Sequence, residues 1–125
     1  MRVPIQVRYN DYDAKGHVNN AVYLTYFELA RTSAWRSVSD QEDAGFILAE
    51  ARVAYRSPAM IGDPLVAEVT TGECRTRAWV WHYRLLDERD DRVVAEGQTT
   101  QVMFDYEARR PIPISDELRA ALAGI

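Results

Sequence analysis

The sequence predicts an α+β domain in which one antiparallel sheet of about five strands curls around one main helix. Residues 20–38 carry apolar side chains at helical spacing, and five shorter segments, one before the helix and four after it, have the alternation or the β-rich composition of strands. A chain of 125 residues with 47% hydrophobic and 27% charged residues is sized for one core. We therefore expect a single domain over residues 1–125.

The first strand and the helix are predicted from two different periodicities. Apolar residues alternate with polar ones in the first strand, at Val3, Ile5 and Val7. A polar loop starts at residue 9 or 10, and Asn19 is the predicted N-cap of the helix. The apolar side chains of the helix form one broad surface that must be covered: Val22, Tyr23, Tyr26, Phe27, Ala30, Ala34 and Trp35.

Four strands are predicted after the helix. They span residues 47–55, 65–71, 78–86 and 93–104, with turns at 61–64, 72–77 and 87–91. The last three runs are spaced as consecutive antiparallel hairpins. A short C-terminal helix is predicted to start at Ser115 and to end near Gly124.

Composition excludes several functional classes. A net charge of −4 and a pI near 5.1 argue against general binding of nucleic acid. The single Cys74 permits no internal disulfide, and with His17 and His82 it makes no recognisable spacing of a structural zinc site. The sequence shows no membrane-spanning apolar run and no signal peptide, so we expect a cytoplasmic protein that does not bind membranes.

The segment before the main helix concentrates the residues that could carry chemistry. Asp11, Asp13, Gly16, His17 and the pair Asn19-Asn20 precede the apolar helix directly. A helix start offers N–H groups without internal partners, which can stabilise negative charge on a substrate, and a nearby acid can then act on the carbon. The alternative is a capped helix after a polar turn, because Asp and Asn favour such positions for local reasons.

The same segment resembles hotdog-fold acyl-CoA thioesterases of the 4-hydroxybenzoyl-CoA thioesterase type. In that family a strand enters an acid-x-acid turn, followed by Gly, often a His-Val-Asn-Asn run, and an aromatic-rich helix. Two weaker similarities extend the match over nearly the whole chain, at residues 55–65 and 111–114. The resemblance implies a hotdog fold and hydrolysis of an acyl-CoA to a carboxylic acid and coenzyme A, with no metal or redox cofactor.

The resemblance also implies roles for residues of the loop. Asp13 matches the catalytic carboxylate, which either attacks the thioester carbon or activates a water. The backbone N–H of Asn20 would polarise the thioester carbonyl, and Ala21 could supply a second N–H. Asp11 is expected to hold the turn, and Gly16 to give the backbone a conformation that a side chain would forbid.

Four further residues are candidates for substrate binding. His17 could orient the acid or line the pocket, or it could be an ordinary exposed loop histidine. Tyr23, with Tyr26 and Phe27, would be either a wall of an apolar acyl channel beside the helix or plain core.

Arg75 and Arg77 match the turn where the 4-hydroxybenzoyl-CoA type meets the phosphates of coenzyme A, although a solvated turn also favours charge. Relatives often carry a hydroxyl residue where this chain has Ala78, which puts the finer phosphate or pantetheine contacts in doubt.

Other functions are less well supported by the sequence. The chain has no Gly-x-Ser-x-Gly motif of a serine hydrolase, and His82 is expected to be a hydrogen-bonded sheet residue. A hotdog hydratase would pair Asp and His five apart with a proline before the His, which this chain lacks. A noncatalytic acyl-CoA-binding module remains the alternative outside enzymology. The exposed edge of a single sheet, together with the resemblance, predicts a homodimer or homotetramer.

Overall fold

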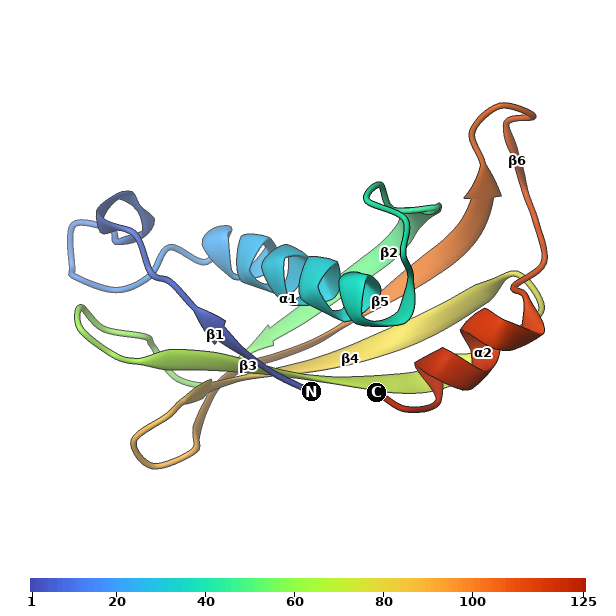
Figure 1. Cartoon of the computed structure of the whole chain (residues 1–125). Coiled ribbons are helices and arrows are strands. Elements are labelled where there is room, and N and C mark those ends of the chain that lie inside the picture. The colour runs from blue at the N-terminus through green and yellow to red at the C-terminus, as the bar shows by residue number, and fades with distance from the viewer.

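The computed structural model describes residues 1–125 and shows one antiparallel sheet curled around one long helix (Figure 1). The strand order is β1-β3-β4-β5-β2, and a short β6 pairs with β5. The strands are β1 (Arg2–Ile5), β2 (Phe46–Tyr55), β3 (Leu65–Cys74), β4 (Ala78–Asp87), β5 (Arg92–Asp105) and β6 (Arg110–Pro111). The helices are the 3-10 turn η1 (Tyr9–Asp11), α1 (Val22–Val38) and α2 (Asp116–Leu122).

The predicted hairpins are confirmed for β3, β4 and β5, which pair in sequence order. The other two pairings join strands that are not consecutive in the sequence. Strand β2 pairs with β5, and β1 pairs with β3. Strand β2 is therefore an edge strand of ten residues with β5 on one side and no strand on the other. An edge of this length leaves a row of backbone N–H and C=O groups available for another chain.

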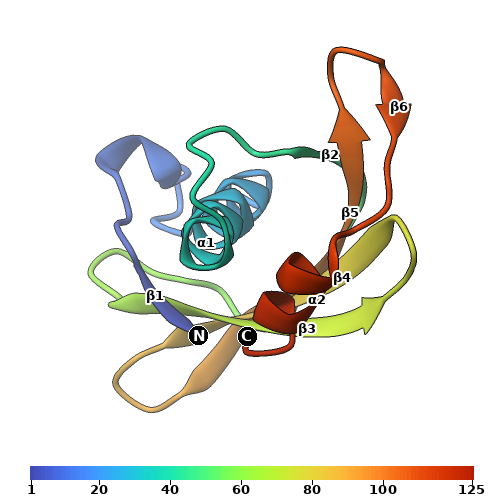
Figure 2. The same ribbon diagram turned by 45° about the vertical axis from the view of Figure 1, so that its right-hand side comes forward.

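The core lies between α1 and the concave face of the sheet (Figure 2). The predicted apolar surface of α1 is confirmed, because six of its residues are buried: Tyr23, Tyr26, Phe27, Ala30, Ala34 and Trp35. The ring of Phe27 stacks on Tyr83 of β4 at 4.8 Å and lies against the backbone at Gly97 of β5, where no side chain intervenes. Glycine at that position lets the helix approach the sheet closely.

Two elements have other ends than the sequence predicts. Strand β1 ends at Ile5, and α1 begins at Val22 because residues 20 and 21 form a turn before the helix. The C-terminal helix has its predicted cap, since the Ser115 hydroxyl accepts the Leu118 N–H at 3.1 Å. Neither η1 nor β6 was predicted, because both are too short to show a periodicity. No helix has the length and apolar character needed to cross a bilayer.

An ion-pair cluster joins two turns at the end of the sheet where β3 begins. Arg89 and Arg92 both contact the carboxylates of Asp63 and Asp87. The Arg89 side chain outweighs burial and holds the pKa of Asp87 well below its ordinary value. Arg92 also donates to the Ser57 hydroxyl at 2.7 Å, so the cluster fixes the chain that leaves β2.

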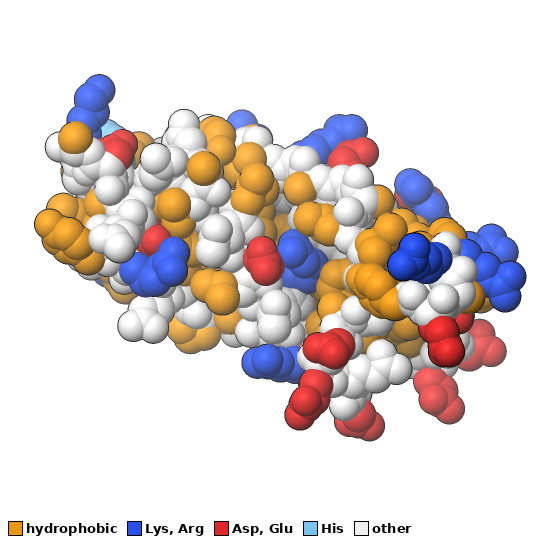
Figure 3. Space-filling view, turned by 90° about the horizontal axis from the view of Figure 1, so that it is seen from above, with side chains coloured by type: hydrophobic (Ala, Val, Ile, Leu, Met, Phe, Trp, Pro, Cys, Tyr) orange, Lys and Arg blue, Asp and Glu red, His pale blue; other side chains and the backbone are white.

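The surface charges of the fold show no cationic stripe on the face seen in Figure 3. Lys and Arg side chains are scattered there among apolar and acidic ones, and acidic side chains gather at the end where α1 finishes and α2 lies. Exposed acids in these segments include Asp40, Glu42, Asp43, Asp116 and Glu117.

Candidate functional site

A cavity of about 290 Å³ lies where the loop before α1 meets the end of β2. Its wall on the loop and helix side is formed by Asp13, His17, Val18, Asn20 and Tyr23. Its other wall is the chain that ends β2: Tyr55, Arg56, Ser57 and Pro58. The structure thus brings the predicted carboxylate, the predicted N–H donor and two predicted substrate-binding residues, His17 and Tyr23, to one place.

Asp13 is held by the backbone of its own turn. Its Oδ1 atom accepts the Lys15 N–H at 2.8 Å and the His17 N–H at 3.1 Å, while Oδ2 accepts no hydrogen bond from the chain. The bonds from Lys15 and His17 lower the pKa of Asp13 from its ordinary value. Gly16 closes the turn with a φ of +75°, which confirms the conformation expected of it. Asp13 therefore presents an ionised, exposed carboxylate with one free oxygen.

Asp11, two residues earlier, has the structural role predicted for it. Its carboxylate is buried and accepts bonds from the Arg8 backbone at 2.9 Å, the Arg8 side chain at 3.0 Å and the Tyr26 hydroxyl at 2.8 Å. Burial would raise the pKa of Asp11, but these hydrogen bonds outweigh it and leave the pKa below its ordinary value. Asp11 thereby ties the loop to α1 and lines no part of the cavity.

The turn that leads into α1 contains the Asn20 N–H, which has no partner within the chain. The N-cap of α1 is Ala21 and has no side-chain cap bond, so the predicted cap at Asn19 was wrong by two residues. Asn19 instead closes the turn before the helix, because its side-chain Oδ1 accepts the Ala21 N–H at 3.0 Å and its carbonyl accepts the Val22 N–H at 2.9 Å. The first of these bonds occupies the Ala21 N–H, which we predicted as a second oxyanion donor. The Asn20 N–H donates to no atom of the chain. Of the two predicted donors for the thioester carbonyl, only Asn20 is therefore available.

The remaining loop and helix candidates divide between the cavity and the core. His17 is partly exposed and pairs through its backbone with Met60. Tyr23 is 2% exposed, and its hydroxyl accepts the Ala59 N–H at 3.3 Å. Tyr26 and Phe27 do not line the cavity and belong to the hydrophobic core. Of the two roles that we considered for them, channel wall and core, the structure supports the core.

The turn between β3 and β4, which carries Arg75 and Arg77, lies at the opposite end of the molecule from the loop before α1, which carries Asp13 (Figure 1). The turn at Met60 touches the Asp13 loop, and β3 then carries the chain away over ten residues, about 33 Å at the usual rise of a strand. Arg75 pairs with Glu73 at 2.7 Å, whereas the exposed Arg77 forms no ion pair. Within one chain, therefore, these arginines and the carboxylate do not meet.

Tyr55 is a cavity residue that the sequence did not single out for function. Its hydroxyl donates to the Asn20 carbonyl at 2.8 Å, and its ring contacts Tyr23 edge to face at 5.3 Å. In the sequence, Tyr55 continues the alternation of β2 and begins the segment 55–65 that resembles the family, and neither pattern gives it a role of its own. Only the pairing of β2 with β5 brings the end of this strand to the start of α1.

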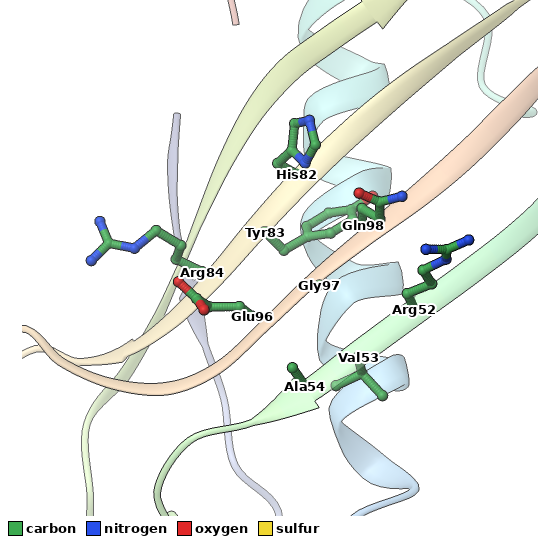
Figure 4. A pocket seen from close by; sticks show the side chains of 9 residues that line it. All are labelled: Arg52, Val53, Ala54, His82, Tyr83, Arg84, Glu96, Gly97 and Gln98. Atoms are coloured by element: carbon green, nitrogen blue, oxygen red, sulfur yellow. The ribbon is translucent and has the colours of Figure 1, made fainter.

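A larger hollow of about 550 Å³ lies on the face of the sheet away from α1 (Figure 4). Its charged side chains already have partners, since Arg52 pairs with Glu50 and Arg84 with Glu68. His82 is exposed there and its side chain forms no hydrogen bond, so the prediction of a hydrogen-bonded sheet histidine was wrong. The alternation of β4 turns His82 outward and its neighbours Trp81 and Tyr83 inward.

The chain matches known proteins along nearly its whole length. The family model of the thioesterase-like superfamily covers residues 7–122. The long-chain acyl-CoA thioesterase FadM of Escherichia coli (strain K12) is 26% identical over 130 residues, covering 98% of this chain and 96% of that protein. The acyl-CoA thioesterase YbgC of Haemophilus influenzae is 26% identical over 125 residues, covering 94% of this chain and 90% of that protein.

Solved structures give the same result for the fold. A Thermus thermophilus thioesterase complexed with coenzyme A and zinc superimposes with a TM-score of 0.88 and 30% identity, covering 97% of this chain and 95% of that one. A putative thioesterase from Pseudomonas aeruginosa superimposes with a TM-score of 0.85 and 30% identity, covering 98% and 96%. The predicted hotdog architecture is confirmed, and the chain belongs to the thioesterase-like superfamily.

Proposed function

We propose that this protein hydrolyses acyl-CoA thioesters to a carboxylic acid and free coenzyme A. The observation that carries the proposal is the cavity lined by both Asp13 and Asn20. The Asp13 carboxylate is ionised and its Oδ2 accepts no hydrogen bond from the chain, and the Asn20 N–H has no partner within the chain. Thioester hydrolysis needs an attacking oxygen and a donor for the carbonyl oxygen as it gains charge. The names of FadM and YbgC support the same activity.

In this mechanism the thioester carbonyl lies in the cavity with its oxygen near the Asn20 N–H. Either Asp13 Oδ2 attacks the carbonyl carbon, or Asp13 takes a proton from a water that attacks it. The C–S bond then breaks and the thiolate of coenzyme A leaves and is protonated. On the nucleophilic route a water hydrolyses the resulting mixed anhydride, which restores the Asp13 carboxylate and releases the acid.

We further propose that Arg75 and Arg77 bind the phosphates of coenzyme A. Guanidinium groups suit phosphate because their planar fork donates two hydrogen bonds, and Arg77 is exposed and free of acidic partners. Because these arginines lie far from Asp13 of the same chain, the proposal requires a second protomer to supply them.

The open edge of β2 is the place for that second protomer. Antiparallel pairing of two β2 edges about a twofold axis would turn the partner end over end. The partner's β3–β4 turn would then lie at the same end as Asp13 of the first chain. We therefore propose a homodimer, or a tetramer built from such dimers, with a site shared between two chains.

The finer assignment, to the 4-hydroxybenzoyl-CoA type, rests on the resemblance of the loop over residues 11–20 and remains a proposal. Release of free thiol from a panel of acyl-CoAs of graded chain length, with one aromatic acyl-CoA, tests both levels. Turnover of any member supports a thioesterase, and preference for the aromatic one supports the finer type. Binding of these compounds without thiol release would leave the noncatalytic module as the better explanation.

A further inference from the structure

We infer that Tyr55 is a positioning residue whose hydroxyl fixes the Asn20 N–H for its role on the thioester carbonyl. The inference rests on the proposed function and adds a residue to that site. Tyr55 stands at the end of β2 and Asn20 at the start of α1, 35 residues apart in sequence. The contact between them joins the two walls of the cavity.

The bond from Tyr55 completes the restraint of one peptide group. The Asn20 carbonyl and the Ala21 N–H belong to the same planar peptide. The carbonyl accepts the Tyr55 hydroxyl at 2.8 Å, and the N–H donates to Asn19 Oδ1 at 3.0 Å. Both polar ends of this peptide are therefore held, one from β2 and one from the loop.

The neighbouring peptide carries the N–H that matters. Its carbonyl, that of Asn19, accepts the Val22 N–H at 2.9 Å, and its N–H is that of Asn20. Of the four polar atoms in the two peptides on either side of Asn20, three are bonded within the chain and only the Asn20 N–H is not. Stabilisation of an oxyanion requires an N–H that has no partner and whose peptide is already held in position, because the peptide then need not reorient at the moment of reaction.

The surroundings of Tyr55 favour positioning over a purely structural role. The residue is 46% exposed, so its hydroxyl has water available and does not need the Asn20 carbonyl as a partner. Its ring is held independently by the edge-to-face contact with Tyr23, which is itself buried. Removal of the hydroxyl alone should leave the ring in place and release only the peptide.

The test compares Tyr55→Phe with Tyr106→Phe. Tyr106 is a matched control, because its hydroxyl donates to the Phe46 carbonyl at the same 2.8 Å, it is 59% exposed, and it binds the far end of β2. We expect kcat of Tyr55→Phe to fall about tenfold, a fraction of the loss of a whole oxyanion donor, with KM nearly unchanged. The control should keep the wild-type kcat. Equal kcat values in the two variants would overturn the inference.

A second measurement does not depend on turnover. The ¹⁵N relaxation of the Asn20 amide reports its order directly, and its order parameter should drop in Tyr55→Phe but not in Tyr106→Phe. An unchanged order parameter together with an unchanged kcat would mean that Tyr55 positions nothing. If the wild-type protein released no thiol from any acyl-CoA, the proposed function would fail, while the order parameter would still decide whether Tyr55 fixes the Asn20 N–H.

Discussion

Two aspartates only two residues apart have opposite tasks because their surroundings differ. Asp11 is 1% exposed and bonded on both oxygens, whereas Asp13 is exposed and keeps Oδ2 free. Hydrogen bonds lower the pKa of both carboxyl groups, so both are ionised at neutral pH. A bonded, buried carboxylate stabilises the loop, and an exposed one with a free oxygen can react.

We predict that Asp13→Asn lowers kcat by about 10² to 10⁴, typical of the loss of a positioned acid–base group. Since the backbone hydrogen bonds from Lys15 and His17 lower the pKa of Asp13 from its ordinary value, protonation of this residue should reduce wild-type turnover only at a pH below the range where an ordinary aspartate titrates. Steady-state kinetics over a pH series measure both effects. A variant that retains more than about a tenth of wild-type turnover would contradict the assignment, because a tenfold loss is within reach of indirect effects.

Asp11→Asn is the contrast for this experiment. The change removes a charge that Arg8 and the Tyr26 hydroxyl now satisfy, so stability should fall by about 1–3 kcal/mol, as for other buried hydrogen-bonding groups. Thermal melts should therefore separate the two variants, with Asp13→Asn close to wild type and Asp11→Asn clearly lower.

At the scale of elements, the contact between α1 and β5 leaves no space for a substrate between them. The Phe27 ring fills the space over Gly97 and stacks on Tyr83, so that stretch of the helix–sheet interface is packed core. The cavity instead opens where the loop before α1 meets the end of β2.

Gly97→Ala should therefore destabilise the fold by about 1–3 kcal/mol, the usual cost of overpacking. An added Cβ would meet the Phe27 ring and come within 2.6 Å of the Arg52 carbonyl, which is backbone and cannot turn away. Gly72→Ala is the matched control on β3, since there the Cβ meets only the exposed His82 side chain, which can rotate. Chemical denaturation of both variants gives the comparison, and equal midpoints would show that the α1–β5 contact is looser than described.

At the scale of the whole molecule, the two halves of the proposed site lie at opposite ends of one chain. Asp13 belongs to the end where β3 begins, and the arginines belong to the turn where β3 finishes. Pairing of β2 edges is the simplest symmetric arrangement that puts the two together.

A mixing experiment tests this arrangement. Asp13→Asn should be nearly inactive, and Arg75→Ala with Arg77→Ala should raise KM more than it lowers kcat, because phosphate contacts far from the thioester give uniform binding. In a dimer with shared sites, refolding the two variants together should restore about a quarter of all sites to the wild-type pair of residues. Activity with the wild-type KM should then reappear. If the mixture behaves as the sum of its parts, each site belongs to one chain.

The sequence by itself determined the type and order of the main elements, because periodicity and turn chemistry are local properties. It also located the Asp13 loop, because the bonds to the Asp13 carboxylate come from residues at most four apart and Gly16 supplies the positive φ of the turn. Only the tertiary structure decided which strands become neighbours, and with them the position of Tyr55, the enclosure of Phe27 and the separation of Arg75 from Asp13. These contacts join segments tens of residues apart, and their pairing depends on which surfaces can be buried together, a property that no single segment displays.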